Sequence, residues 1–186
     1  MPPSVKRRLR SNPYLSRMSA KIGQSSSEDS LLGERAADAP ATPATAGDVM
    51  SYPIRTASAN SPLAAVAALM RDEDVGIVPI VDDEGGRLLG VITDRDIVVR
   101  VDAEAAPVDL VRASDVMTTT NLVTVRPRDD LHEVIDRMGQ QGLHRMLVTD
   151  EGNRVVGIIS VGDLARRTDL PERIQDMLDQ ITRRQT

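Results

Sequence analysis

The sequence predicts an α/β (α+β) fold built from two copies of one β-α-β-β-α unit, preceded by a disordered tail. Two observations predict this fold: similar segments recur 67 residues apart, and both copies show the same succession of strand and helix patterns. A third observation supports a globular fold, because 40% of the 186 residues are hydrophobic and 27% are charged. This length suits one ordinary domain or two small ones.

The internal repeat is clearest at its two ends. Asp48-Val49-Met50 recurs as Asp115-Val116-Met117, and the segment 90–97 recurs as 157–164. Between these anchors the spacing is 68 residues. The second copy gains one residue in its first turn and loses one in the hairpin turn, which explains the difference. Apolar residues pair at this spacing, with Leu63, Val66 and Met70 matching Leu131, Val134 and Met138.

The first copy contains each element of the unit in order. A short strand over 54–57 precedes a helix that begins at Ser61-Pro62, where a Ser cap and a Pro favour a helix N-terminus. The β-branched run 77–81 and the apolar run 88–92 form a hairpin around an acidic, Gly-containing turn. Thr93 opens the closing helix.

The second copy repeats this order. Its strand covers 122–125, and its helix begins at Asp129-Asp130. The hairpin joins strands at 146–149 and 155–159, and Ser160 opens the last helix of the unit.

Each copy is too small to be very stable alone, since a unit of about 55 residues buries a limited core. Its strands are apolar on both faces, so the other copy is the obvious cover. We therefore expect two domains, 46–108 and 109–168, packed sheet to sheet around a pseudo-twofold axis. The equivalent pairs Met50/Met117 and Met70/Met138 are expected to lie in the core.

Two segments lie outside the repeats. Residues 1–45 are rich in Pro, Ala and Ser and carry seven basic and four acidic residues, a composition typical of a disordered leader. Residues 169–186 predict an amphipathic C-terminal helix. Its apolar stripe, Leu170, Ile174, Met177, Leu178 and Ile181, would pack against the module, across a dimer, or on a protein partner.

The composition excludes several classes of site. The chain has no Cys, two His, two Tyr and no other aromatic residue, which excludes disulfides, thiol nucleophiles and aromatic stacking of single strands. No metal site is predicted. No apolar run is long enough to span a membrane, so we expect a soluble, cytoplasmic protein.

The sharpest local motif is Gly-h-h-Thr/Ser-x-x-Asp (h, apolar), with Thr93 and Asp96 in the first copy and Ser160 and Asp163 in the second. A hydroxyl at a strand end and a carboxylate three residues later form a helix capping box. The same arrangement suits a nucleoside phosphate, since helix amides face an anion and a carboxylate can bind a ribose diol. The residues alone leave both interpretations open.

The tandem units, the Asp-Val-Met start and the doubled motif together resemble a pair of CBS domains, a Bateman module, over residues 46–168. The stretch 93–100 is similar to small stand-alone bacterial CBS-pair proteins of the hypoxic-response type. In this family the cleft between the units binds AMP, ADP, ATP or S-adenosylmethionine, and no further cofactor is required.

The resemblance also implies site residues. It assigns a ribose-binding role to Asp96 and Asp163, and a place near ribose or phosphate to Thr93 and Ser160. His144-Arg145 is similar to a basic pair that reaches phosphates, which the first copy lacks, so the copies should differ in phosphate preference. The remaining expected ligand-binding residues are Thr118, Asn121, Val123, Met146, Ser51, Ile54, Arg55, Gly76, Ile77 and Val78.

Three functions remain open. A regulatory module that binds an adenosine-containing ligand and relays it to an unknown protein partner is the first, and homodimers are expected. The alternative is a ligand-free structural or protein-interaction module, acting through its dimer surface, tail or C-terminal helix. Nucleic-acid binding would involve only the basic tail. The sequence offers no nucleophile–base pair or metal cluster, so we do not expect an enzyme.

Overall fold

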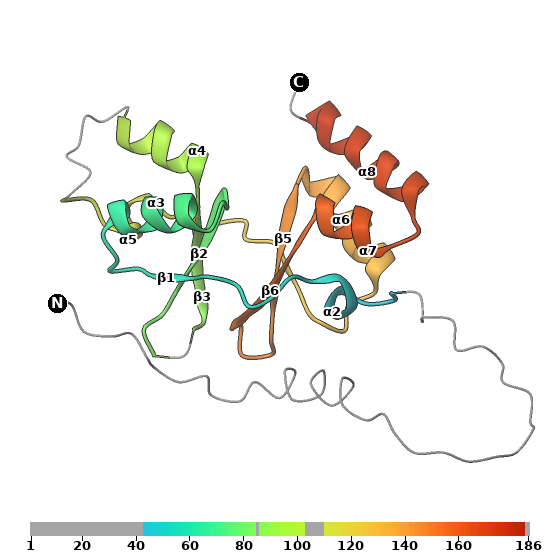
Figure 1. The fold of residues 1–186 in the computed structure, drawn as a ribbon, viewed down its shortest axis with the longest axis horizontal. Helices are drawn as coiled ribbons and strands as arrows, with labels where there is room; N and C mark the ends of the chain where they lie inside the picture. The colour runs from blue at the N-terminus through green and yellow to red at the C-terminus, as the bar shows by residue number, and fades with distance from the viewer. Residues whose placement is uncertain (1–42, 85, 103–109, 185–186) are drawn as a thin grey trace, which may run out of the picture. The chain divides into compact units, whose positions relative to one another are not determined.

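The computed structural model describes residues 43–84, 86–102 and 110–184. Most of the predicted tail lies outside the described residues. The described part contains two three-stranded sheets with helices beside them (Figure 1). One sheet has the order β1 (Ala57–Ser58), β2 (Ile77–Val81), β3 (Leu88–Thr93), and the other has the order β4 (Thr124–Val125), β5 (Arg145–Thr149), β6 (Val155–Ser160). In each sheet the short first strand is parallel to the second, and the second and third form an antiparallel hairpin. The predicted β-α-β-β-α order is therefore confirmed in both repeats.

The first repeat begins with a short helix that the sequence did not predict. Its strand β1 is shorter and later than the expected strand over 54–57, because Ile54 and Arg55 line a pocket instead of pairing. The expected Ser61 cap is wrong: its hydroxyl accepts from the Ser58 amide, and Pro62 occupies the N-cap position. The elements are α2 (Ala46–Val49), β1 (Ala57–Ser58), α3 (Leu63–Asp72), β2 (Ile77–Val81), β3 (Leu88–Thr93), α4 (Asp94–Ile97) and the π-helical turn η1 (Val98–Asp102).

The second repeat has the same order of elements, and its long helix begins where the sequence predicts. Asp130 caps its long helix, as predicted, by accepting from the amides of His132 and Glu133. The elements are α5 (Ala113–Val116), β4 (Thr124–Val125), α6 (Leu131–Gln141), β5 (Arg145–Thr149), β6 (Val155–Ser160), α7 (Val161–Arg167) and α8 (Pro171–Arg184).

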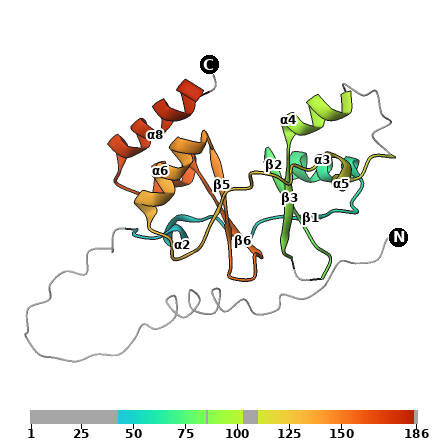
Figure 2. The same ribbon diagram turned by 180° about the vertical axis from the view of Figure 1, so that it is seen from behind.

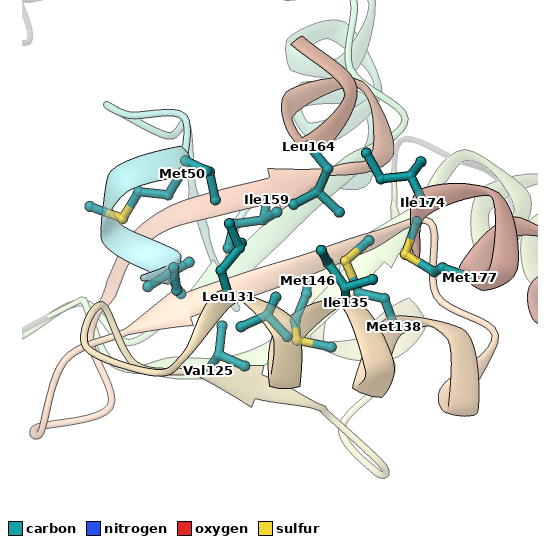
Figure 3. Packing of buried hydrophobic residues seen from close by; sticks show 14 of the residues in the cluster. Met50, Val125, Leu131, Ile135, Met138, Met146, Ile159, Leu164, Ile174 and Met177 are labelled. Carbon is teal, nitrogen blue, oxygen red and sulfur yellow. The ribbon is translucent and has the colours of Figure 1, made fainter. Parts of the chain in front are cut away.

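The repeats exchange their first segments, which we call the lead segments (residues 45–55 and 112–123). Ala46, Val49 and Met50 of the first lead segment are buried in the core of the second repeat. Figure 3 shows Met50 beside Ile159 in that core. Reciprocally, α5 contributes Ala113 and Val116 to the core of the first repeat. Each core is therefore completed by the other half of the chain.

The glycine that opens each motif permits this exchange. A Cβ at Gly90 would lie 2.8 Å from the Thr118 carbonyl oxygen, and a Cβ at Gly157 would lie 2.7 Å from the Met50 sulfur. At Gly90 the clash would be with backbone, so a side chain there would push the second lead segment away from the strand, whereas at Gly157 the Met50 side chain would have to move.

The backbone contacts between the repeats come in equivalent pairs, as a pseudo-twofold axis requires. Ser51 and Ile158 exchange backbone hydrogen bonds of 2.8 and 3.1 Å, and their counterparts Thr118 and Val91 exchange bonds of 2.8 and 3.0 Å. The two hairpins also bridge at equivalent positions, Arg87 and Arg154.

The C-terminal helix α8 lies along α6 in both ribbon views (Figures 1 and 2). Ile174, Met177 and Ile181 are buried in the second core, with Leu170 and Leu178 at its edge. The predicted apolar stripe of the C-terminal helix thus packs against the second repeat of the same chain. Neither a dimer contact nor a protein partner is needed to bury it.

Candidate functional site

Both Thr/Ser-x-x-Asp motifs form helix capping boxes. The Thr93 hydroxyl accepts from the Asp96 amide (3.2 Å), and the Asp96 carboxylate accepts from the Thr93 amide (2.8 Å). Ser160 and Asp163 repeat this exchange at 3.1 and 2.9 Å. The capping interpretation is confirmed, and each carboxylate is thereby held at the start of its helix.

Asp163 is the more enclosed of the two carboxylates, with 5% of its side chain exposed against 16% for Asp96. One oxygen accepts from the Ser160 hydroxyl (2.5 Å), and the other accepts from the Ser51 hydroxyl (2.8 Å) and contacts Arg166 (3.2 Å). Burial raises the pKa of Asp163. The hydrogen bonds from Ser160 and Ser51 and the charge of Arg167 outweigh it, so the pKa lies below its ordinary value.

The first pocket, pocket A, has a volume of about 400 Å³ and lies beside the Asp163 box. Its walls combine the lead segment and residues 73–77 of the first repeat with the start of β5, β6 and α7 of the second. Three arginines and three acids line it, so it carries charges of both signs. The lining residues are Ser51, Pro53, Ile54, Arg55, Glu73, Asp74, Val75, Ile77, Arg145, Ile158, Ser160, Asp163 and Arg166.

The second pocket, pocket B, is the repeat counterpart of pocket A around the Asp96 box, with a volume of about 230 Å³. The lead segment of the second repeat forms most of one wall, and β3 forms another. Among its lining residues Arg145 is the single basic one and Asp96 the single acid. The lining residues are Ile77, Leu88, Val91, Thr93, Asp96, Thr118, Thr120, Asn121, Leu122, Val123, Thr124, Leu143, Arg145 and Leu147.

The structure brings most predicted site residues to these two pockets. Four do not line either one. Val78 and Met146 are buried in the two cores, because they are inward-facing residues of β2 and β5. His144 is exposed, and its carbonyl oxygen accepts from the Val161 amide. Gly76 lies close to the Arg145 guanidinium, whose Nη1 would be 3.7 Å from a Cβ at that position.

Sequence reasoning missed an arginine in each repeat. Arg167 donates to the carbonyl oxygens of Val49 and Met50 (2.9 and 2.8 Å) and to the Ser51 hydroxyl (3.3 Å). It thus fastens the first lead segment to the helix that carries Asp163. An Asp-x-x-x-Arg spacing in both repeats was the available signal.

Its counterpart Arg100 makes the same connection in the first repeat. It bonds the Val116 carbonyl oxygen, the Thr118 hydroxyl (2.9 Å) and the Asp96 carboxylate (3.2 Å). The two arginines therefore hold each lead segment against the wall of its pocket.

Among residues 43–84, 86–102 and 110–184, no three His, Cys, Asp or Glu side chains gather in a group that could hold a metal ion. None of the described helices has the length and apolar character needed to cross a membrane.

Two repeats exchange their lead segments, and each repeat places a helix capped by an aspartate beside a pocket that both repeats line. This arrangement is that of a tandem CBS pair. The CBS domain family model matches residues 46–102 and 113–169, and the chain belongs to that family. The sequence is 36% identical over 118 residues to the CBS domain-containing protein YhcV of Bacillus subtilis, covering 63% of this chain and 81% of that one.

Two other relatives connect the chain to solved structures. It is 32% identical over 128 residues to hypoxic response protein 1 of Mycobacterium tuberculosis, covering 69% of this chain and 86% of that one. A crystal structure of that protein with two coordinated zinc ions matches 66% of this chain and 97% of its own with a TM-score of 0.59. The CBS pair of protein MJ0100, in complex with 5′-methylthioadenosine and S-adenosyl-L-methionine, matches at 28% identity, covering 66% and 93%, with a TM-score of 0.57.

Proposed function

We propose that this CBS pair is a regulatory module that binds an adenosine-containing ligand, AMP, ADP, ATP or S-adenosylmethionine, between its repeats. One observation carries the proposal: each Thr/Ser-x-x-Asp box lines a pocket together with the lead segment of the opposite repeat. A ligand in such a pocket touches both repeats at once, so its binding energy can act on how they meet. The adenosyl compounds bound by the CBS pair of MJ0100 support this ligand class.

Each part of the pocket has a role for such a ligand. Asp96 and Asp163 would accept hydrogen bonds from the ribose hydroxyls, which in pocket A would replace the Ser51 hydroxyl on Asp163. The lead segments, with Ile54 in pocket A and Val123 in pocket B, would contact the adenine. Arg145 would meet the phosphates.

The module would act in the cytoplasm as a homodimer, without catalysis of its own, and would transmit ligand occupancy to a protein partner. The basic tail is the only part of the chain whose charge suits nucleic acid.

Calorimetric titration with the four ligands tests the proposal on the unmodified chain and on Asp96→Asn, Asp163→Asn and the double variant. Each substitution keeps the side-chain size and removes the charge, and should weaken binding by about 10- to 100-fold, since a hydrogen bond to a charged group contributes about 1.5–3 kcal/mol.

Asp115→Asn is the matched control, because Asp115 caps the Arg112 amide from an exposed position outside both pockets. Absence of binding by all four ligands, or unchanged affinity in the double variant, would reject the proposed site.

One observation favours the ligand-free alternative. Both carboxylates already accept from the hydroxyl and amide of their own boxes, so the motifs have a complete structural role without a ligand. An unchanged melting temperature with every adenosyl compound would support a structural or protein-interaction module.

A further inference from the structure

Arg145 is the one basic residue that lines both pockets. It begins β5, and its exposed side chain reaches the space where the two pockets approach each other. At the equivalent position of the first repeat stands Ile77, which also lines both pockets. A symmetric pair would place two cations there, whereas this chain places one.

The other arginines of pocket A are already paired. Arg55 contacts the Glu73 carboxylate at 2.9 Å, and Arg166 contacts Asp163 at 3.2 Å. Within the described residues the guanidinium of Arg145 takes part in no ion pair or hydrogen bond. The Asp94 carboxylate also approaches Gly76, where a Cβ would lie 3.1 Å from Asp94 Oδ2 and 3.7 Å from Arg145 Nη1. Arg145 is therefore the cation with its donors available to a ligand anion.

We infer that the two pockets compete for Arg145, so that an anionic ligand in one pocket weakens the binding of an anionic ligand in the other. The inference rests on the proposed function and adds regulation to it. Once the single positive charge of Arg145 is paired with a phosphate in one pocket, a phosphate in the other pocket meets a neutralised cation and a like charge. An uncharged adenosine compound needs no cation and is free of this competition.

The competition gives the module a graded response. One ligand binds at low concentration, and the second binds only at a higher one. The coupling is reciprocal, because each ligand must weaken the other by the same factor. We expect a factor of about ten, within the roughly 5- to 150-fold range of couplings between sites.

The test compares AMP binding to the unmodified chain with AMP binding to chains that have one usable pocket. Ile54→Trp fills pocket A, and Thr120→Trp fills pocket B, so each variant reports the affinity of the remaining pocket alone. In the unmodified chain the affinity for the second AMP should be about tenfold lower than the affinity of the same pocket in the variant whose other pocket is filled.

Two further measurements identify the cause. Ile77→Arg supplies the missing cation and should restore independent binding of two AMP molecules. Adenosine should bind the unmodified chain with the affinities measured in the single-pocket chains.

The outcomes separate the two proposals. AMP binding to both pockets with the single-pocket affinities would overturn the competition and leave the proposed function standing, as would coupling that persists unchanged in Ile77→Arg. A chain in which only one pocket ever binds AMP would also overturn the competition. Failure of AMP, ADP, ATP and S-adenosylmethionine to bind at all would overturn both proposals.

Discussion

At Asp163, a helix cap and a proposed ligand contact fall on the same carboxylate. Its oxygens accept from Ser160 and Ser51, and Arg166 lies within 3.2 Å. These donors stabilise the ionised form of a side chain that is 5% exposed. A ligand diol would therefore meet a carboxylate that is charged and fixed in place, at the cost of one bond to Ser51.

Asp163 should make the folded state sensitive to acid. Because its pKa is lower in the folded chain than in the unfolded one, its contribution is complete above about pH 5 and is lost as the pH falls through the folded pKa. Asp163→Asn should lower the free energy of unfolding at pH 7 by about 1–3 kcal/mol. The difference from the unmodified chain should shrink once the pH falls below about 4, which urea unfolding at pH 7, 4 and 3 measures.

Asp176→Asn is the control for this series, since Asp176 is exposed on α8. It should change stability by less than about 0.5 kcal/mol at each pH. A difference between Asp163→Asn and the unmodified chain that stays constant or grows between pH 4 and pH 3 would contradict the lowered pKa of Asp163.

The second repeat differs from the first in that its core includes an additional C-terminal helix, α8, which packs on α6. The α6–α8 contact is close because Gly139 lies where a Cβ would come within 2.8 Å of the Gln180 side chain and 3.4 Å of the Met177 Cα. Met177 and Ile181 are each 1% exposed in the resulting core. Helix α8 is thus a structural part of the second repeat.

Met177→Ala should therefore destabilise the chain by about 2–5 kcal/mol, the usual cost of truncating a buried methionine to alanine. Gln175→Ala, on the exposed face of the same helix, should cost less than about 0.5 kcal/mol. Chemical denaturation of both variants measures the contrast. Equal midpoints would mean that α8 does not pack on α6 in solution.

At the scale of the whole molecule, the exchanged lead segments make the repeats interdependent. The second core takes Ala46, Val49 and Met50 from the first repeat, and the first core takes Ala113 and Val116 from the second. Neither repeat contains a complete core in its own residues.

A fragment of residues 110–186 should accordingly lack the cooperative thermal transition of the longer chain. It loses the buried side chains of α2 and the partner strands of the pseudo-twofold contacts. Circular dichroism melting compares it with a chain of residues 43–186, which retains both repeats. An equally cooperative transition at the same temperature in the fragment would disprove the interdependence.

The sequence predicts the repeated elements well because their signals are local. The run Ile77–Val81 is the observed strand β2, and Asp130 and both capping boxes lie where the motifs place them. The exchange of lead segments was not predictable from these signals, because Val49 and Val116 are apolar whichever core they enter. The roles of Arg100 and Arg167 depend on that exchange, since their acceptors lie on the exchanged segments.

Binding of an adenosine-containing ligand beside both Thr/Ser-x-x-Asp boxes can be tested by titrating the ¹⁵N-labelled chain with AMP and following the amide chemical shifts. If the ligand binds there, the largest shifts will fall on the amides of Thr93, Asp96, Ser160 and Asp163 and on those of the two lead segments. Shifts confined to other parts of the chain, or no shifts with AMP, ADP, ATP or S-adenosylmethionine, would contradict binding beside the two boxes.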